Sequence, residues 1–220
     1  MSADHTLLIA KAARAALVPL GFKQRGRSRL WYCDHGWWGE IIEFQPSAWS
    51  KGSYLNVAAM WLWQPGGHWA FNESRRVDAF CEYQDEAQFS ADMTRLATLV
   101  ASETLKQRQQ FDSINTAARY VIQESTPCFW QRYHAAVFAS ISGDRQTARI
   151  FLEAVLAEPA VTPWMTEVHA KAIRLSEHLS SIEDARALVA EDVRQIRAQL
   201  GLAVLPSAHD LWTGRSSQGV

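Results

Sequence analysis

The first run of apolar positions along the chain has the spacing of an α-helix. Residues 4–18 return small and aliphatic side chains to one face, while Lys11 and Arg14 lie off that face. The apolar side chains on this face are Leu7, Leu8, Ala12, Ala15 and Ala16. Pro19 and Gly21 come next, and both residue types favour the end of a helix.

The pattern then changes from helical to extended. Several short segments are rich in aromatic and β-branched residues and are bounded by Gly, Pro, Asp or Ser, as strands are. The predicted strands are 29–34, 37–45 and 53–63, with a fourth at 79–83. The break at Asp34-His35-Gly36 is short, which favours an antiparallel hairpin over a crossover connection.

The rest of the chain has helical periodicity. Asp85 and Gln88 form a capping-box pair at the start of a long helix, whose apolar stripe is expected to pack on the sheet. That stripe is Phe89, Met93, Leu96, Ala97, Val100 and Leu105. Further helices are predicted at 113–124, from Thr126-Pro127 onward, after Gly143-Asp144, from Thr162-Pro163 onward, and from Ser181 to Gly201. In the helix after Gly143-Asp144, the side chains predicted to be buried are Ile150, Phe151, Ala154 and Val155.

These elements predict an α+β fold. A leading helix and a small antiparallel sheet packed by a long helix occupy residues 1–111. An all-helical region follows over 112–205, and the polar segment 206–220 is expected to be a loose tail beyond Trp212.

Composition excludes some classes of protein. With 48% hydrophobic and 20% charged residues the chain resembles a globular protein, and a net charge of −1 gives no overall attraction to nucleic acid or an anionic membrane. Lys11 and Arg14 interrupt the first apolar stretch, and nowhere do 18 apolar residues run together. The three cysteines have no paired spacing and indicate reduced thiols. We therefore expect a cytoplasmic protein that makes no membrane contact and for which nucleic acid is not the favoured partner.

Residues 17–63 carry a series of short motifs. They are Leu20-Gly21-Phe22, Arg25-Gly26, Trp31-Tyr32, Ile42-Glu43-Phe44-Gln45, Trp49 and Asn56-Val57. Together they resemble the domain of unknown function 4304 family, in which a leading helix ends in a similar turn and is followed by a strand pair with a terminal Gln and a strand opening on Asn. The resemblance implies a small α+β domain with an antiparallel sheet, and no known activity. Glu43 departs from the smaller or uncharged residue expected there.

Small residues in the second half resemble a tetratricopeptide-type helical hairpin. The pattern consists of Ala136, Gly143-Asp144, Ala148, Leu152, Val155 and Pro159. A second unit keeps only part of the pattern, and a repeat array needs about three units. We expect a helical extension and not an array.

Seven tryptophans fall between Trp31 and Trp69. Trp37 and Trp38 are adjacent on a strand and must point to opposite faces, so the rings cannot all line one groove. Core packing is therefore favoured over an aromatic platform for a sugar-like ligand or single-stranded nucleic acid. Trp49 and Trp69 lie in predicted loops and are expected to be exposed.

Four basic residues alternate after the first helix: Lys23, Arg25, Arg27 and Arg29. In an extended segment they would share one side and could bind an anion. The alternative, which we favour, is a solvated edge whose charges discourage strand pairing with another chain. Gln45 and Asn56 are polar residues within apolar strands; they either face a ligand pocket or, as we favour, bond the loop backbone around 47–52.

No catalytic or cofactor motif is present. The seven histidines are scattered, no HExxH or HxH occurs, and there is no P-loop, GxSxG or GxGxxG. We expect no catalytic residue, no metal and no cofactor. The leading hypothesis is a non-catalytic binding module for a protein partner or a small anionic ligand. An enzyme of unrecognised type on a small anionic or sugar-like substrate, and single-stranded nucleic-acid binding, are the alternatives. The candidate binding residues are Arg25, Arg27, Arg29, Gln45, Trp49, Asn56 and Trp69.

Overall fold

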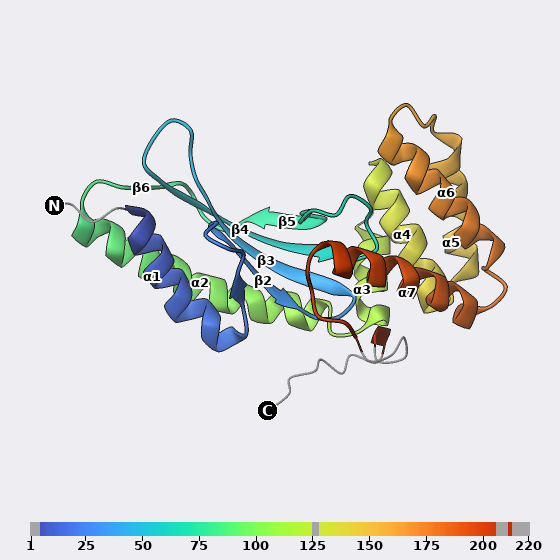
Figure 1. Ribbon diagram of the computed structural model, residues 1–220, viewed down its shortest axis with the longest axis horizontal. Coiled ribbons are helices and arrows are strands. Elements are labelled where there is room, and N and C mark those ends of the chain that lie inside the picture. Colours follow the sequence, from blue (N-terminus) through green and yellow to red (C-terminus); the bar gives the residue numbers. More distant parts are fainter. Residues whose placement is uncertain (1–4, 125–127, 206–210, 213–220) are drawn as a thin grey trace. The chain divides into compact units, whose positions relative to one another are not determined.

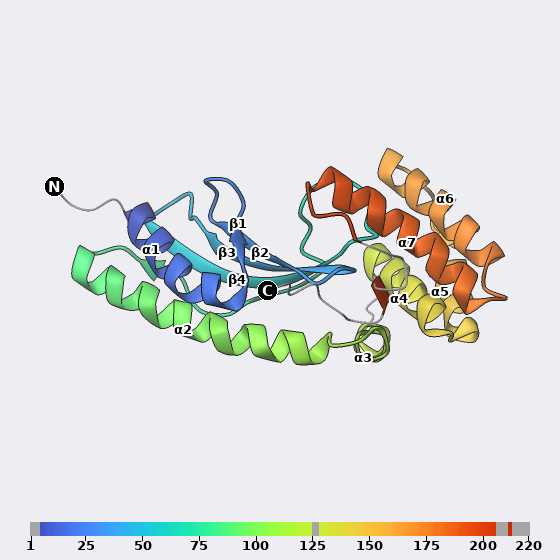
Figure 2. The ribbon, with the colours of Figure 1, turned by 60° about the horizontal axis from the view of Figure 1, so that its bottom comes forward.

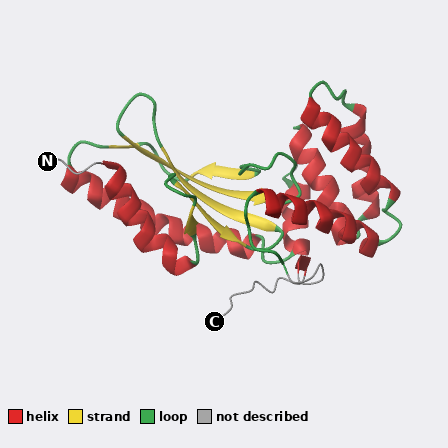
Figure 3. Cartoon of the chain, in the orientation of Figure 1, coloured by secondary structure: helices red, strands yellow, loops and turns green. Residues whose placement is uncertain are grey.

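Two groups of residues pack internally and form separate units of the chain. The computed structural model describes residues 5–124, 128–205 and 211–212. Unit 1 comprises the chain up to residue 60 together with 73–109, and unit 2 comprises 61–72 together with the chain from residue 110 onward. The strands belong to unit 1, with β4 ending one residue inside unit 2, and helices make up most of unit 2 (Figures 1 and 3).

Unit 1 begins with helix α1 (His5–Leu17), which runs into the short 3-10 helix η1 (Val18–Leu20). Gly21 ends this segment with φ 87°, and its N–H donates to the carbonyl of Val18. That left-handed conformation is costly for residues with a side chain and free for glycine, so the Leu20-Gly21-Phe22 motif is a helix C-cap.

The sheet of unit 1 contains six strands. They are β1 (Lys23–Gln24), β2 (Leu30–Asp34), β3 (Trp38–Gln45), β4 (Gly52–Trp61), β5 (Glu73–Arg76) and β6 (Cys81–Glu82). The order is β1-β2-β3-β4-β5, and β6 pairs with the start of β4. The β2–β3 pair is antiparallel, with Asp34 opposite Gly39 and Cys33 opposite Glu40, which confirms the predicted hairpin.

One face of this sheet is covered by α1 and by α2 (Glu86–Gln110), as Figure 2 shows. Alternate side chains of β2, β3 and β4 point into that core, including Trp31, Ile42 and Val57, all at most 2% exposed. The predicted stripe of α2 is buried from Phe89 to Val100. Leu105, which the pattern predicts on this stripe, is instead 56% exposed, because Thr104 takes the inward position in that turn.

Unit 2 is organised around a buried central helix. Its helices are α3 (Ile114–Gln123), α4 (Phe129–Ser142), α5 (Arg145–Ala157), α6 (Pro163–Glu177) and α7 (Ile182–Gln199). Helix α4 packs against the other four. Gly143 (φ 90°) ends α4 and the Asp144 side chain caps α5, as the Gly-Asp pair predicts, whereas Ile150 is exposed and not buried. The predicted helix start at Thr126-Pro127 and nearly all of the predicted tail lie outside the described residues.

The tryptophans of the first half pack mainly in the interior, as predicted. Trp61 and Trp63 stack with their ring centroids 6.0 Å apart, and the edge of Phe138 meets both rings within unit 2. Trp69 is only 8% exposed, so its predicted exposure is wrong. The segment 61–72 is a closed loop, since the Asn72 side chain accepts a hydrogen bond from the Trp61 N–H, and its Gly67 turn lies against Gln199 of α7.

The α+β prediction is confirmed. Strands β1 and β5 are not predicted by the pattern, because β1 has two residues and β5 reads Glu-Ser-Arg-Arg, with no apolar alternation. None of the helices formed by the described residues combines the length and the apolar character that crossing a membrane requires.

Candidate functional site

Two connections of unit 1 project from the same end of the sheet. β2 begins at Leu30, which pairs with Glu43 close to the end of β3. The turn before β2, residues 25–29, therefore lies at the end from which the β3–β4 loop, residues 46–51, departs (Figure 1). The topology brings together loops that are distant in the sequence.

This end of the sheet exposes one tryptophan and several cations. Trp49, in the β3–β4 loop, is 95% exposed, which confirms its predicted exposure. Exposed basic side chains come from both connections and from the end of β5. We call the following residues the sheet-end surface: Arg25, Arg27, Trp49, Lys51 and Arg76. Glu82 of β6 is exposed at the same end and reduces the positive charge of this surface.

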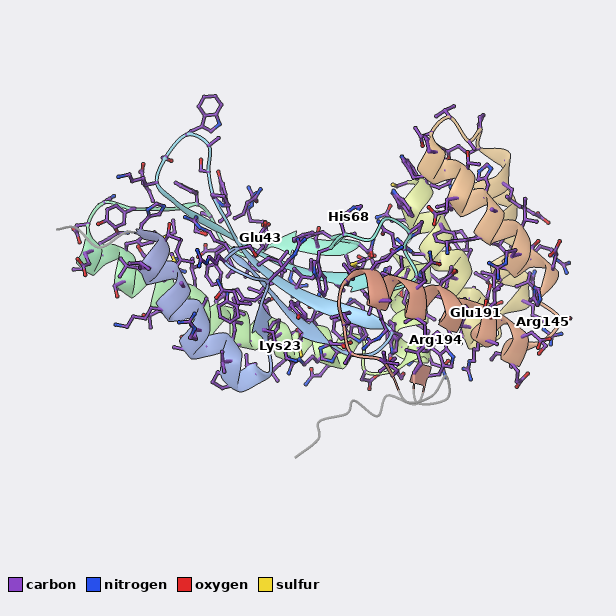
Figure 4. The ribbon with its side chains drawn as sticks, viewed as in Figure 1. Lys23, Glu43, His68, Arg145, Glu191 and Arg194 are labelled. Atoms are coloured by element: carbon purple, nitrogen blue, oxygen red, sulfur yellow. The ribbon has the colours of Figure 1, made fainter. Side chains whose placement is uncertain are left out.

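The basic run is not extended, so its four side chains do not share one side. Only Lys23 (labelled in Figure 4) and Gln24 form β1, and the chain then turns through Gly26 at φ 55°. The Arg25 N–H donates to the carbonyl of Leu30 over 2.9 Å, which closes the turn. The extended conformation that this alignment requires is not formed, because a glycine in the left-handed region converts the segment into a hairpin.

Arg29 forms hydrogen bonds within unit 1, whereas the side chains of Arg25 and Arg27 are exposed. Its guanidinium donates to the carbonyl of Gly52 over 3.3 Å and to Oγ1 of Thr6 over 3.0 Å, and it lies 3.1 Å from the ring of His5. Arg29 thus joins the first turn of α1 to the start of β4 and is part of the fold.

Gln45 and Asn56 lie together on the sheet face opposite the helices. The Asn56 amide donates to Oε1 of Gln45 over 2.9 Å and to Oε2 of Glu43 (labelled in Figure 4) over 3.1 Å. Arg76 donates to the same Gln45 oxygen over 3.0 Å and lies 3.8 Å above the ring of Tyr54. The side chains bond one another and not the loop backbone, contrary to the favoured prediction. They hold the Arg76 guanidinium in place.

A second polar cluster lies at the other end of the β2–β3 hairpin. Cys33 and Glu40 are cross-strand partners, and His35 follows two residues after Cys33. One ligand atom of each of the three side chains lies within 4.8 Å of the others. His35 Nε2 is 3.1 Å from Glu40 Oε2, and its ring stacks on Trp38 with centroids 4.2 Å apart.

Arg108 of α2 adds a second basic side chain to this cluster. Its Nε donates to Glu40 Oε2 over 2.8 Å, and its Nη2 donates to the carbonyl of Leu20 over 2.8 Å. Glu40 is fully buried, and its Oε1 has no hydrogen-bond partner in the described part of the chain. The guanidinium of Arg108 and the imidazole of His35 therefore both contact Oε2 of Glu40, and neither contacts Oε1.

The protonation of His35 follows from these neighbours. Burial lowers the pKa of His35, but hydrogen bonds and charges from Cys33 and Glu40 outweigh that effect and raise the pKa to about 9. The imidazole is therefore protonated near neutral pH. Chemically, the cluster can hold a proton between a carboxylate and an imidazole, or the same three side chains can act as metal ligands.

Sequence reasoning missed this cluster. The signal was the Cys-x-His spacing at the end of a strand, combined with a hairpin turn that returns Glu40 opposite Cys33. The spacing places Cys33 and His35 on one side of an extended chain. Glu40 joins them only when the register of the hairpin is known.

Comparisons with known proteins found no relative of this chain. No family model matches the sequence, and neither the curated proteins nor the solved structures include a match.

Proposed function

We propose that this protein is a non-catalytic binding module that recognises an acidic segment of a partner protein at the sheet-end surface. The observation that carries the proposal is Trp49, whose side chain is 95% exposed in the connection that also bears Lys51, at the same end of the sheet as the turn that bears Arg25 and Arg27. Covering an exposed indole with a partner lowers the free energy of the complex, because apolar surface is removed from water. Tryptophan and arginine are also enriched among the residues that contribute most to binding at interfaces.

The charge of the surface favours an acidic partner. Four of its five residues are cations, against the exposed Glu82 and the half-buried Glu43, which Asn56 already engages. Arg76 is held over Tyr54 and by Gln45, so its guanidinium is pre-positioned at low entropic cost. Carboxylates on a partner would bind these donors, and an apolar residue would cover Trp49.

A direct binding titration tests this proposal. The probes are fluorescein-labelled peptides of about 15 residues, each with several glutamates around one leucine or phenylalanine, followed by anisotropy. Trp49→Ala should weaken binding about tenfold or more, as expected for a central anchor. The double variant Arg25→Ala/Arg27→Ala should weaken binding and flatten its dependence on salt.

The matched control is Arg145→Ala/Arg149→Ala, which removes two exposed arginines from α5 (Arg145 is labelled in Figure 4). That variant should bind the peptides as the wild type does. Equal binding by wild type and Trp49→Ala would contradict the proposal. So would binding of inorganic phosphate or a thymidine oligonucleotide at this surface in preference to every peptide, because those results indicate a small-anion or a nucleic-acid site.

A further inference from the structure

The cluster of Cys33, His35 and Glu40 has the composition of a transition-metal site. It supplies a sulfur, an imidazole nitrogen and a carboxylate oxygen, which is a ligand set that zinc accepts. The atoms lie within 4.8 Å of one another, and ligand atoms around a tetrahedral zinc ion are about 3.5 Å apart. Small side-chain movements would therefore bring all three onto one ion.

A second observation supports a cation at this cluster. Oε1 of Glu40 is the one carboxylate oxygen among the buried side-chain atoms that lack a partner within the described residues. A buried carboxylate with an unsatisfied oxygen is costly, and a bound cation would satisfy it. Arg108 does not fill this role, because its Nε donates to the other oxygen, Oε2.

The surroundings restrict the side chains of Glu40 and His35 as an outer shell of a metal site does. Arg108 fixes the carboxylate of Glu40 and is itself held by the carbonyl of Leu20. Trp38 stacks on the ring of His35 with the ring centroids 4.2 Å apart. Such orienting contacts raise the affinity of metal ligands.

We propose that Cys33, His35 and Glu40 bind one zinc ion, with the fourth coordination position open to water. This site is distinct from the sheet-end surface and does not depend on the proposed function. In such a site Cys33 coordinates as a thiolate, His35 as a neutral imidazole and Glu40 as a carboxylate, so that metal binding releases protons.

Cobalt substitution tests the site directly. The purified 220-residue chain is freed of metal with a chelator and titrated with Co²⁺, and the thiolate-to-cobalt absorption band is recorded. The band should appear, saturate at one ion per chain and disappear when Zn²⁺ is added. Cys33→Ser and His35→Gln should each abolish the band and weaken Zn²⁺ binding by about 100-fold or more.

The matched control is Cys81→Ser. Cys81 is buried in the same core as Cys33, at 7% exposure against 8%, but belongs to no three-residue ligand group among the described residues. Its variant should retain the band. Near-ultraviolet circular dichroism shows whether each variant is folded. If Cys33→Ser does not fold, His35→Gln alone tests the site. Absence of the band in the wild type, or its persistence in a folded Cys33→Ser or His35→Gln variant, would overturn the proposal.

Discussion

Nε of Arg108 lies 2.8 Å from Oε2 of Glu40, a carboxylate that is fully buried between a strand and a helix. The two residues are far apart in the sequence, and their pairing fixes the last turns of α2 against β3. Because Glu40 is removed from water, its charge depends on Arg108 and His35 for compensation.

Removing Arg108 should therefore destabilise the fold strongly. Arg108→Ala leaves a buried carboxylate with one partner fewer, and breaking buried ion pairs costs about 3–5 kcal/mol. Since the side chain of Arg108 is 25% exposed, we expect a loss of about 3 kcal/mol in the free energy of unfolding, measured with urea at neutral pH.

Arg95→Ala provides the comparison on the same helix. Arg95 pairs with Asp78 over 2.5 Å, but its side chain is 56% exposed, so the loss should be below about 1 kcal/mol. Similar losses for the two variants would show that burial of Glu40 does not set the strength of its ion pair.

Alanine substitutions of the three arginines in the basic run should differ in their effects on the free energy of unfolding. Arg29→Ala removes hydrogen bonds to Gly52 and Thr6, and we expect a loss of about 2 kcal/mol in the free energy of unfolding, because bonds to charged donors contribute more than neutral ones. Arg25→Ala and Arg27→Ala remove exposed side chains and should change stability by less than about 0.5 kcal/mol.

Thermal and urea unfolding of the three variants check this order. An Arg29→Lys variant adds a sharper test, since lysine keeps the charge but cannot reproduce the fork of donors. It should recover less than half of the loss. Full recovery would mean that charge alone, and not the hydrogen bonds to α1 and β4, accounts for the effect.

The parts of the fold that repeat a pattern are predictable from the sequence. The stripe from Phe89 to Val100 and the alternation in β2, β3 and β4 each involve several side chains that share one environment. β5 carries no such signal, because its Glu-Ser-Arg-Arg sequence is stabilised by pairing with β4 and by the bond of Arg75 to Glu103. Its position could not be read from side-chain hydrophobicity.

The candidate sites depend on register and turn geometry, which the sequence leaves open. A shift of one residue between β2 and β3 would move Glu40 away from Cys33 and onto the other face. Likewise, the alternating arginines predict one basic edge only if the chain is extended, and Gly26 turns it instead. Trp49 is the simpler case, since a tryptophan in a short polar loop has few neighbours to cover it.

Phe138 should be a main support of unit 2. Its ring meets Trp61 and Trp63 edge-on at 5.0 and 4.9 Å between centroids, and it is fully buried. Phe138→Ala should cost about 3–5 kcal/mol in the free energy of unfolding. Ile150→Ala, at an exposed position of the same unit, should cost less than about 0.5 kcal/mol by the same urea measurement. Equal costs would argue against this aromatic contact as a core element.

His134 should make the stability of the protein fall in mild acid. The ring is buried in unit 2 and accepts a hydrogen bond from Nε1 of Trp63 over 3.3 Å at Nδ1. Burial lowers the pKa of His134 to about 3, whereas the pKa of an unfolded histidine is about 6.5. Below about pH 6.5 the unfolded chain binds a proton that the folded chain refuses, so protonation favours unfolding.

The stability contributed by neutral His134 is therefore complete above about pH 6.5 and is lost progressively as the pH falls toward about 3. Between about pH 7 and pH 5 the loss from this group should be about 2 kcal/mol. Urea unfolding of the wild type and of His134→Gln at both pH values isolates the contribution of His134 to this loss, because glutamine keeps an acceptor for Trp63 but does not titrate. The variant should lose about 2 kcal/mol less than the wild type over this interval. Equal losses would show that His134 takes up its proton in the folded state.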